Sequence, residues 1–257
     1  MSGTPIEHTL NLASSLLATF ARAGQGIATE PAAVRPAQPL ELYEFEACPY
    51  CRLVREAVTE LDLDVLIYPC PKDGERYRPQ AVEIGGKAQF PLLVDPNTGK
   101  HLYESADIIA YLYRTYGQRD LPLRWAAMPL QALTSSLAGV PRSAAGRQSR
   151  PSRAPEQPLE LYSFEASPFA RLVRETLCEL EIPYVLRSVG RRTATDWVPP
   201  QVRASMAISA TPSTPNRKAL LERAGTISIP YLVDPNTATE LAESGDIVDY
   251  LRKTYAQ

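Results

Sequence analysis

Two cysteines in the spacing Cys-x-x-Cys are the residues of this chain best suited to chemistry. Cys48 and Cys51 belong to the stretch CPYC, which follows an apolar, aromatic run at 40–45 and precedes apolar residues in helical spacing. Pro49 suits the first turn of a helix, because the N–H that it lacks would have no partner within the helix there. The pattern predicts a strand, a turn and a helix, with Cys48 where the helix begins.

A cysteine at the start of a helix is favoured as a thiolate. It faces unpaired backbone N–H groups and the positive end of the helix dipole, so we expect the pKa of Cys48 to lie below that of a free thiol. Cys51 lies one helical turn further on, close enough to form a disulfide with Cys48, as in a dithiol redox centre. Two alternatives stay open. One is half of a zinc site, for which only Cys70, Cys178 and two histidines remain as further ligands, and the other is an inert pair of thiols.

The composition is that of an ordinary globular protein. The 257 residues suffice for one or two domains, and 44% of them are hydrophobic. A net charge of −2 gives no electrostatic reason to expect nucleic acid or an anionic membrane as a partner. Four cysteines, two of them in one Cys-x-x-Cys, favour a reducing compartment.

The N-terminal region predicts neither a membrane span nor a secretory signal. Its longest apolar stretch, residues 10–21, is interrupted by four polar residues and is too short to cross a bilayer. It also lacks the basic start of a secretory signal. We therefore expect a cytoplasmic protein, with an organelle as the alternative if the weakly charged residues 1–39 form a transit segment.

The chain is an internal duplication. The block PLELYEFEACPYCRLVREAVTEL from Pro39 returns as PLELYSFEASPFARLVRETLCEL from Pro158, 119 residues later. The block FPLLVDPNTGKHLYESADIIAYL from Phe90 returns as IPYLVDPNTATELAESGDIVDYL from Ile229, 139 residues later. The second repeat thus carries 20 additional residues between its blocks, which we expect to form a loop.

A weaker match joins the segment that begins at Thr9 to the segment that begins at Pro129, so each repeat is expected to begin with its own amphipathic helix. The stretch between the repeats is rich in Pro, Ser, Ala and Arg and is expected to be exposed. The chain then divides into four parts: an N-terminal helix and linker at 1–38, a domain with CPYC at 39–120, a helix and flexible linker at 121–157, and a domain with SPFA at 158–257.

The order of elements within a repeat predicts a mixed sheet. After the strand and helix around CPYC, repeat one shows a strand at 65–68, a short helix at 78–84, a hairpin from 92–94 and 102–103, and a helix from 105 to about 116. One parallel crossover followed by an antiparallel hairpin gives a four-stranded mixed sheet flanked by helices. The predicted fold class is α/β, with the order βαβ-α-ββα in each of two tandem domains.

CPYC at a strand-to-helix turn, Phe90-Pro91 before a strand and Glu104-Ser105 at a helix start resemble the thioredoxin superfamily. Within it, they are most similar to glutaredoxins and to the N-terminal domain of glutathione S-transferases. The resemblance covers both repeats and implies two tandem thioredoxin-like, glutaredoxin-like domains, the second of them degenerate. An all-helical domain of the transferase kind follows neither repeat, so no binding site for a hydrophobic co-substrate is evident from the sequence.

Glutathione is the ligand that the resemblance implies. In such proteins the proline at the position of Pro91 is cis, and the backbone at Phe90 pairs with the cysteinyl part of glutathione. At a helix start, the hydroxyl of Ser105 and free N–H groups can hold the γ-glutamyl carboxylate, while Glu104 can pair with its amine. Plain capping, with Ser105 as the N-cap, stays open as the alternative. Three further residues complete the expected site, the lysine meeting the glycyl carboxylate: Tyr50, Gln89 and Lys87.

The leading hypothesis is a glutathione-dependent thiol-disulfide oxidoreductase. Cys48 would attack a disulfide or a glutathionylated substrate, and Cys51 or glutathione would resolve the mixed disulfide. The alternatives are a non-catalytic glutathione-binding or scaffold module and a glutathione transferase. We expect glutathione as co-substrate, no metal, and the two repeats packed as an internal pseudo-dimer.

The second repeat keeps the predicted fold but has no thiol at its motif. SPFA places Ser167 at the position of Cys48 and Ala170 at that of Cys51, so disulfide exchange is not possible there. Glutathione binding without chemistry and a structural role, with Ser167 as a simple N-cap, both stay open. Thr226 and Ser228 replace Lys87 and Gln89, whereas four other counterparts of the glutathione residues are kept in kind: Ile229, Pro230, Glu243 and Ser244.

The remaining cysteines are expected to play lesser roles. Cys70 follows the second strand between two prolines and is either a third redox thiol or a spectator. Cys178 lies among apolar residues of a helical run, which favours core packing.

Overall fold

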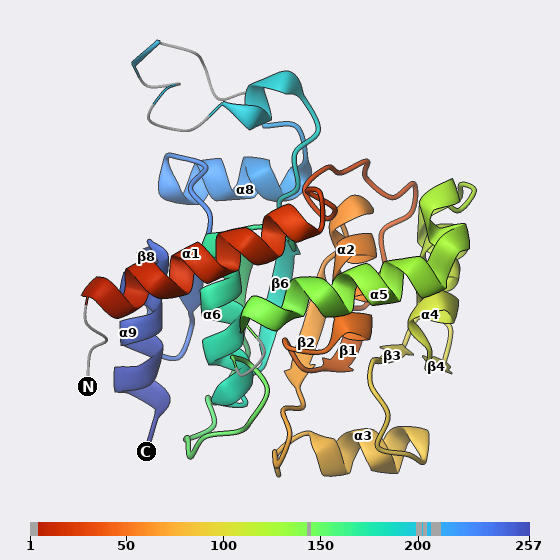
Figure 1. Cartoon of the computed structure of the whole chain (residues 1–257), viewed down its shortest axis with the longest axis horizontal. Helices are drawn as coiled ribbons and strands as arrows, with labels where there is room; N and C mark the ends of the chain where they lie inside the picture. Colours follow the sequence, from red (N-terminus) through yellow and green to blue (C-terminus); the bar gives the residue numbers. More distant parts are fainter. Residues whose placement is uncertain (1–4, 143–144, 199–201, 203–204, 207–211) are drawn as a thin grey trace.

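The computed structural model describes residues 5–142, 145–198, 202, 205–206 and 212–257. A mixed sheet of eight strands runs through both repeats in the order β4-β3-β1-β2-β6-β5-β7-β8 (Figure 1). Repeat one supplies β1 (Leu40–Glu44), β2 (Val65–Pro69), β3 (Leu92–Asp95) and β4 (Lys100–Leu102). Repeat two supplies β5 (Leu159–Ser163), β6 (Tyr184–Ser188), β7 (Tyr231–Asp234) and β8 (Thr239–Ala242).

Helices flank this sheet. In repeat one they are α1 (Pro5–Ala21), α2 (Pro49–Glu60), α3 (Arg78–Gly85) and α4 (Ser105–Leu112), the last continued by a π-helical turn, Tyr113–Gly117. In repeat two they are α5 (Met128–Gly139), α6 (Pro168–Glu179), α8 (Pro215–Ala224) and α9 (Ser244–Tyr255). Short 3₁₀ turns lie at Leu123–Ala127, Val140–Arg142 and Ala194–Trp197, the last within the inserted segment of repeat two. Much of the rest of the loop expected for that insertion lies outside the described residues.

Each repeat forms the four-stranded mixed sheet that its sequence predicts. β1 pairs in parallel with β2 and antiparallel with β3, and β3 pairs antiparallel with β4. β5, β6, β7 and β8 repeat this pattern. The βαβ-α-ββα order of both thioredoxin-like domains is therefore confirmed.

The two half-sheets join edge to edge through β2 and β6, which pair antiparallel. Leu66 lies opposite Val185, and Val65 lies opposite Leu186. Val185 is the counterpart of Leu66 in the duplication, because 119 residues separate them. A residue that faces its own counterpart marks a local two-fold axis between the repeats.

Hydrophobic residues fill both faces of the sheet. Successive side chains of a strand point to opposite faces, so Leu40 and Leu42 of β1 enter one cluster while Tyr43 enters another. The cluster of Leu40 and Leu42 also contains Leu161 and Val173 of the second repeat, and it lies under α2, α4, α6 and α9. On the other face each repeat keeps its own smaller cluster, packed against α3 or α8.

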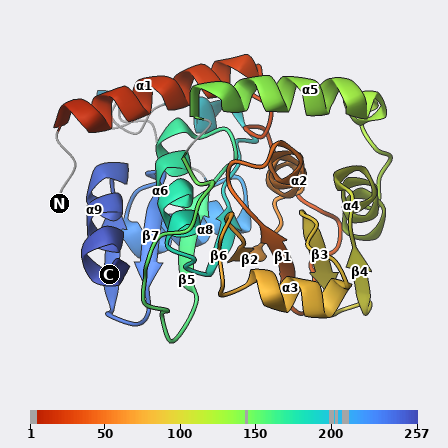
Figure 2. The same ribbon diagram turned by 60° about the horizontal axis from the view of Figure 1, so that its bottom comes forward.

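The first helix of each repeat packs on the other repeat. α1 contacts α6, and α5 contacts α2. The Ser15 hydroxyl of α1 donates to the Pro168 carbonyl at 2.8 Å, and the Ser135 hydroxyl of α5 donates to the Pro49 carbonyl at 2.9 Å. Figure 2 shows both helices as a layer above α2 and α6. The sequence correctly predicts the two helices, but the two repeats have exchanged them.

Charged side chains are buried along the seam between the repeats. Arg55 pairs with Glu165 at 2.8 Å, and their two-fold counterparts Arg174 and Glu46 pair at 3.1 Å. Arg55 also contacts the Glu44 carboxylate, and each of these side chains is at most 3% exposed. Buried charges persist only where partners of opposite sign and hydrogen bonds offset the loss of water.

Burial affects the carboxylates of this cluster differently. It raises the pKa of Glu44 to about 7, because Arg55 offsets only part of the desolvation and the neighbouring carboxylates add repulsion. Burial also acts to raise the pKa of Glu165, but Arg174 and Arg55 outweigh it and hold that pKa at about 2. Glu165 therefore keeps its negative charge beside the buried arginines of the seam, whereas Glu44 titrates near neutrality.

The segment between the repeats runs along the same seam. Most of its described side chains are exposed, as the sequence predicts. Its backbone is bonded to both repeats: the Lys72 N–H donates to the Arg147 carbonyl at 2.6 Å, and the Arg153 N–H donates to the Tyr255 carbonyl at 2.9 Å. The connection therefore contributes contacts to the interface as well as joining the repeats.

Candidate functional site

The start of α2 places the two cysteines of CPYC as the sequence predicts. Cys48 is the N-cap, with extended backbone angles, and Pro49 is the first residue of the helix. The Cys48 sulfur accepts a hydrogen bond from the Cys51 N–H at 3.3 Å. Cys48 is 4% exposed and Cys51 is completely buried, and both thiols are free. A sulfur atom thus takes the role that a serine or aspartate oxygen has in many helix caps.

The two thiols have opposite electrostatic environments. A hydrogen bond from the Cys51 side chain lowers the pKa of Cys48, and the N–H groups of Cys51 and Tyr50 reinforce this effect against burial. Burial raises the pKa of Cys51 well above its ordinary value, and the adjacent Cys48 raises it further. The arrangement can therefore hold a thiolate at Cys48 beside a protonated thiol at Cys51.

The segment before β3 lies beside this helix start. The Phe90–Pro91 peptide bond is cis, as the resemblance implies. The Phe90 ring meets the edge of the Phe45 ring, three residues before Cys48, with 6.3 Å between ring centres. Arg78 of α3 lies over the Phe90 ring, with its guanidinium 4.8 Å from the ring centre.

Glu104 and Ser105 form the start of α4. The structure makes Glu104 the N-cap, which corrects the capping alternative that placed Ser105 there. Glu104 has a φ of +62°, uncommon for a residue other than glycine, and its carboxylate accepts a hydrogen bond from the Gln89 side chain. Ser105 is 4% exposed. The expected residues Gln89 and Glu104 are thus brought together, next to Phe90.

Lys87 and Tyr50 lie at the periphery. The Lys87 ammonium sits 4.4 Å from the centre of the Tyr103 ring, and the Tyr103 hydroxyl donates to the Lys87 carbonyl at 3.0 Å. The lysine therefore already has an aromatic partner and would have to turn to meet a glycyl carboxylate. Tyr50 is half exposed beside Cys48.

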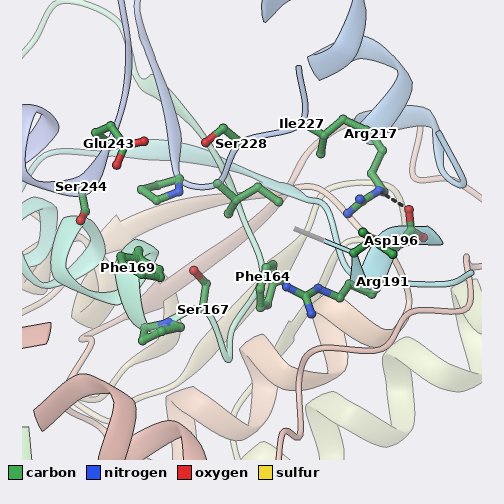
Figure 3. A pocket seen from close by; sticks show the side chains of 14 residues that line it. Phe164, Ser167, Phe169, Arg191, Asp196, Arg217, Ile227, Ser228, Glu243 and Ser244 are labelled. Atoms are coloured by element: carbon green, nitrogen blue, oxygen red, sulfur yellow. Dashed lines mark ion pairs between the residues drawn. The ribbon is translucent and has the colours of Figure 1, made fainter. Parts of the chain in front are cut away.

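In the second repeat, the counterpart positions surround a cavity of about 370 Å³. Figure 3 shows the hydroxyls of Ser167, Ser228 and Ser244 around this space. The cavity brings together all five residues that the duplication predicts for this repeat: Ser167, Ile229, Pro230, Glu243 and Ser244.

The polar groups of this cavity repeat the geometry of the first repeat. The Ser167 hydroxyl caps α6 by accepting from the Ala170 N–H at 3.2 Å, as Cys48 does in α2. The Ile229–Pro230 bond is cis, and Glu243 has a φ of +67°. Ser244 is 3% exposed and lines the cavity, with its hydroxyl in view of this space in Figure 3. A hydroxyl that lines a cavity is suited to bind a polar ligand.

One wall of the cavity was not predicted from the sequence. Arg191 lies over the rings of Phe164 and Trp197, at 5.5 and 4.9 Å from their centres. Arg217 of α8 pairs with Asp196 at 3.0 Å, and both line the cavity. Three of these residues belong to the inserted segment or its border: Arg191, Asp196 and Trp197. Repeat one has no matching block there, so the comparison of the repeats could not indicate them as site residues.

Cys70 and Cys178 are placed differently from Cys48. Cys70 is completely buried, and burial raises its pKa. Cys178 lies on α6 at the seam, where its sulfur accepts from the Glu46 N–H at 3.4 Å, and burial raises its pKa well above the ordinary value. The counterpart Thr59 hydroxyl accepts from the Glu165 N–H at 3.1 Å. Cys178 is therefore part of the two-fold interface, in agreement with a packing role.

Neither a metal cluster nor a membrane-spanning helix occurs in the part of the chain that the structure describes. Across these ranges, His, Cys, Asp and Glu side chains form no group of three or more that could hold a metal ion. In that same part of the chain, no helix combines the length and apolar character that a membrane crossing requires.

A family model described as the N-terminal domain of glutathione S-transferases matches residues 42–120 and 161–257. The chain belongs to this family. Each match falls on one repeat, so this member carries two glutathione S-transferase N-terminal domains in tandem, each with a thioredoxin-like fold.

Two solved structures of a Bombyx mori glutathione transferase are similar to part of this family member. One is 29% identical over 37% of this chain, with a TM-score of 0.30. The other, a complex with GTT, is 27% identical over 37% of this chain, with a TM-score of 0.31. The chain spans less than half of the length of either, 46% and 47%. No curated protein matches the chain.

Proposed function

We propose that the chain is a glutathione-dependent thiol-disulfide oxidoreductase in which the Cys48 thiolate reacts. The observation that carries the proposal is the pairing of Cys48 and Cys51. The first has a lowered pKa at the start of α2, and the second, with a raised pKa, donates its N–H to the first. Dithiol exchange needs a thiolate that attacks first and, next to it, a protonated thiol that can react in the second step.

The proposed reaction begins with a disulfide between glutathione and a substrate thiol. The Cys48 thiolate attacks the glutathione sulfur, a bond forms between these two sulfurs, and the substrate sulfur leaves with the electron pair and takes up a proton from water. A free glutathione thiolate then attacks the glutathione sulfur of this mixed disulfide. Oxidised glutathione leaves and the Cys48 thiolate is restored, so that one free glutathione thiol is consumed for each substrate thiol released. With a protein disulfide as substrate, Cys48 forms a mixed disulfide with one substrate cysteine, and Cys51 attacks the Cys48 sulfur, which releases the reduced substrate. Two glutathione molecules then reduce the Cys48–Cys51 disulfide and leave as oxidised glutathione.

Glutathione is proposed to lie between the starts of α2 and α4. The backbone at Phe90 would bind its cysteinyl part, and Glu104 and Ser105 would bind its γ-glutamyl group. Gln89 supports this placement, because its side chain already contacts Glu104. The family relationship supports glutathione as the ligand, and the free state of all four cysteines supports the reducing, cytoplasmic location proposed from the sequence.

A second candidate function, favoured by the cavity in repeat two, is glutathione binding without chemistry. Ser167 and Ala170 provide no thiol, yet Pro230, Glu243 and Ser244 line the cavity together. In this view the two repeats form an internal pseudo-dimer with one reactive and one unreactive site, which the register of β2 and β6 supports. Transfer of glutathione to an electrophile is a third possibility that the family membership allows.

The experiment that tests the proposal compares wild type with Cys48→Ser in the reduction of a glutathionylated peptide by glutathione. We expect the variant to lose turnover, and we expect Cys51→Ser to retain it on this substrate while losing activity on a protein disulfide. Equal rates for wild type and Cys48→Ser would contradict the proposal. Wild-type turnover only with an electrophilic acceptor would instead favour the transferase.

A further inference from the structure

Arg78 and Arg217 are equivalent residues of the two repeats. Arg78 is the first residue of α3, and Arg217 lies in the first turn of α8. The offset of 139 residues that relates the second pair of repeated blocks leads from one to the other. It also relates Gly86 to Gly225, the glycines in left-handed conformation that end these two helices. The helix after the second strand therefore carries an arginine at the same position of its first turn in both repeats.

Both arginines hold the chain where the second strand ends. In repeat one, the Arg78 Nε donates to the carbonyls of Cys70 and of the residue after it, at 3.2 and 2.6 Å. In repeat two, the Arg217 Nη1 donates to the carbonyls of Val189 and of the residue after it, at 3.0 and 3.4 Å. Val189 is the counterpart of Cys70, 119 residues later. The two guanidinium groups therefore lie against the same loop of each repeat.

The two arginines differ in their acidic partner. The Nε of Arg217 pairs with the Asp196 carboxylate at 3.0 Å, and Figure 3 marks this ion pair. Asp196 lies in the stretch that holds the 20 additional residues of repeat two, for which repeat one has no matching block. Within the part of the chain that the structure describes, Arg78 forms no ion pair with a carboxylate. The arginine of repeat one thus lacks the counter-charge that its equivalent has.

Arg78 lies at the edge of the candidate site around Cys48. Its guanidinium is 4.8 Å from the centre of the Phe90 ring, and that ring meets the Phe45 ring with 6.3 Å between their centres. The Phe45 carbonyl in turn accepts from the Cys48 N–H at 3.0 Å. Arg78 is partly exposed to solvent, so a ligand that binds at Phe90 can reach it.

The second repeat shows where a carboxylate binds to this arginine. Arg217 and Asp196 line the cavity together with Ser167, the counterpart of Cys48. A carboxylate of the chain therefore lies on the arginine in the same cavity as the residue that replaces the reactive cysteine. Repeat one has the arginine without this carboxylate, which leaves its place open to a carboxylate of a ligand.

We propose that Arg78 binds a carboxylate of the ligand in repeat one, at the place that the Asp196 carboxylate occupies in repeat two. This inference rests on the proposed function, because it concerns the substrates of Cys48. A guanidinium group presents parallel N–H donors that match the two oxygens of a carboxylate. Two sources supply such a group: the glycyl end of glutathione, and an acidic side chain beside the disulfide of the substrate. Arg78 is then a specificity-determining residue that favours ligands with a negative charge near the reacting sulfur.

Lys87 is the competing cation in repeat one. The sequence assigns it to the glycyl carboxylate, but its ammonium lies 4.4 Å from the centre of the Tyr103 ring. Arg78 lies instead over the ring of Phe90, the residue whose backbone is expected to bind the cysteinyl part of glutathione. Arg78 therefore needs no rearrangement to meet a carboxylate next to this part of the ligand.

Four glutathionylated peptides test the proposal and separate the two sources. They combine a free or an amidated glycyl carboxylate of glutathione with Asp or Asn beside the modified cysteine. With kcat/KM for reduction as the readout, Arg78→Gln should lose about 10-fold on peptides that carry the recognised carboxylate and nothing on those that lack it. Arg78→Lys should recover part of this loss, because it retains the charge. Dependence on the glycyl group would identify glutathione as the source, and dependence on Asp would identify the substrate side chain.

The same measurements can overturn the proposal. An equal loss on all four peptides would do so, because a loosened loop at Cys70 affects every substrate alike. A carboxylate-dependent loss in Lys87→Gln with none in Arg78→Gln would also do so. Lys72→Gln is the matched control: it removes a positive charge from an exposed side chain of the same loop and should leave all four rates unchanged.

Binding separates a failure of this proposal from a failure of the proposed reaction. If wild type reduces none of the four peptides, the oxidoreductase is contradicted, and calorimetry of the same peptides on the full chain still reports on Arg78. Arg78→Gln should then weaken the binding only of the peptides that carry the recognised carboxylate. Equal affinities of wild type and Arg78→Gln for every peptide, or no binding to wild type, would overturn the role of Arg78.

Discussion

The Glu165 carboxylate of the second repeat accepts from the Arg55 Nε of the first at 2.8 Å, inside the protein. Arg55 lies on α2, the helix that begins with Cys48, so this ion pair connects the reactive repeat to the repeat without thiols. The counterpart pair, Arg174 and Glu46, makes the same connection in the opposite direction. The repeats therefore share a charged interior as well as a sheet and a hydrophobic cluster.

Glu165→Gln should destabilise the protein by about 3 kcal/mol, because it leaves buried arginines without their strongest ionised partner. Unfolding in urea would measure this loss of unfolding free energy, with a signal that reports on both repeats. Glu240→Gln is the control: it breaks the pair of Glu240 with Arg223, in which both side chains are 38% exposed, and should cost about 1 kcal/mol or less. Equal losses of unfolding free energy for the two changes would contradict a particular stabilising role for the buried ion pairs of the seam.

Glu44→Gln should flatten the dependence of stability on pH. The pKa of Glu44 is raised from its ordinary value near 4.5 to about 7 in the folded chain, so the folded state binds a proton that the unfolded state has released. The stability due to this group is present below its unfolded pKa and is lost as pH rises towards 7. We expect the unfolding free energy of wild type to fall more steeply than that of Glu44→Gln between about pH 4.5 and 7. Equal slopes of unfolding free energy against pH for wild type and Glu44→Gln would contradict the raised pKa of Glu44.

Ser244→Ala should weaken glutathione binding at the second repeat. If the Ser244 hydroxyl binds the γ-glutamyl carboxylate, loss of one hydrogen bond to a charged group should lower affinity roughly 10- to 100-fold. Calorimetry of the full chain should then show two sites in wild type, with Ser244→Ala affecting one and Ser105→Ala the other. A single site in wild type that Ser105→Ala abolishes would mean that repeat two has only a structural role.

The sequence predicts the architecture within a repeat well, because short-range signals determine it. Pro49 and the apolar spacing after Cys48 define the start of a helix, and the Asp-Pro-Asn turn defines the hairpin that follows β3. The duplication then carries each assignment from one repeat to the other. For the same reason, the sequence alone predicts Ser167, Pro230 and Ser244 as members of one site, and the three line one cavity.

What the sequence could not predict depends on contacts between the repeats. The match between the segments at Thr9 and Pro129 predicts two equivalent helices. It does not tell whether each helix packs on its own repeat or on the opposite one, because both arrangements would give the same match. The inserted segment has no counterpart in repeat one, so the roles of Arg191 and Asp196 in the cavity wall had no pattern to reveal them.

The most direct test of the central claim is to trap the reaction at its midpoint. Oxidised glutathione should form a stable mixed disulfide with Cys51→Ser, because the second thiol that could displace it is absent. Peptide mass spectrometry under non-reducing conditions should locate one glutathione on Cys48, and the adduct should form with a pH midpoint below that of an ordinary thiol, in keeping with the lowered pKa of Cys48. An adduct confined to Cys70 or Cys178, or no adduct at any pH at which the chain is folded, would contradict the account.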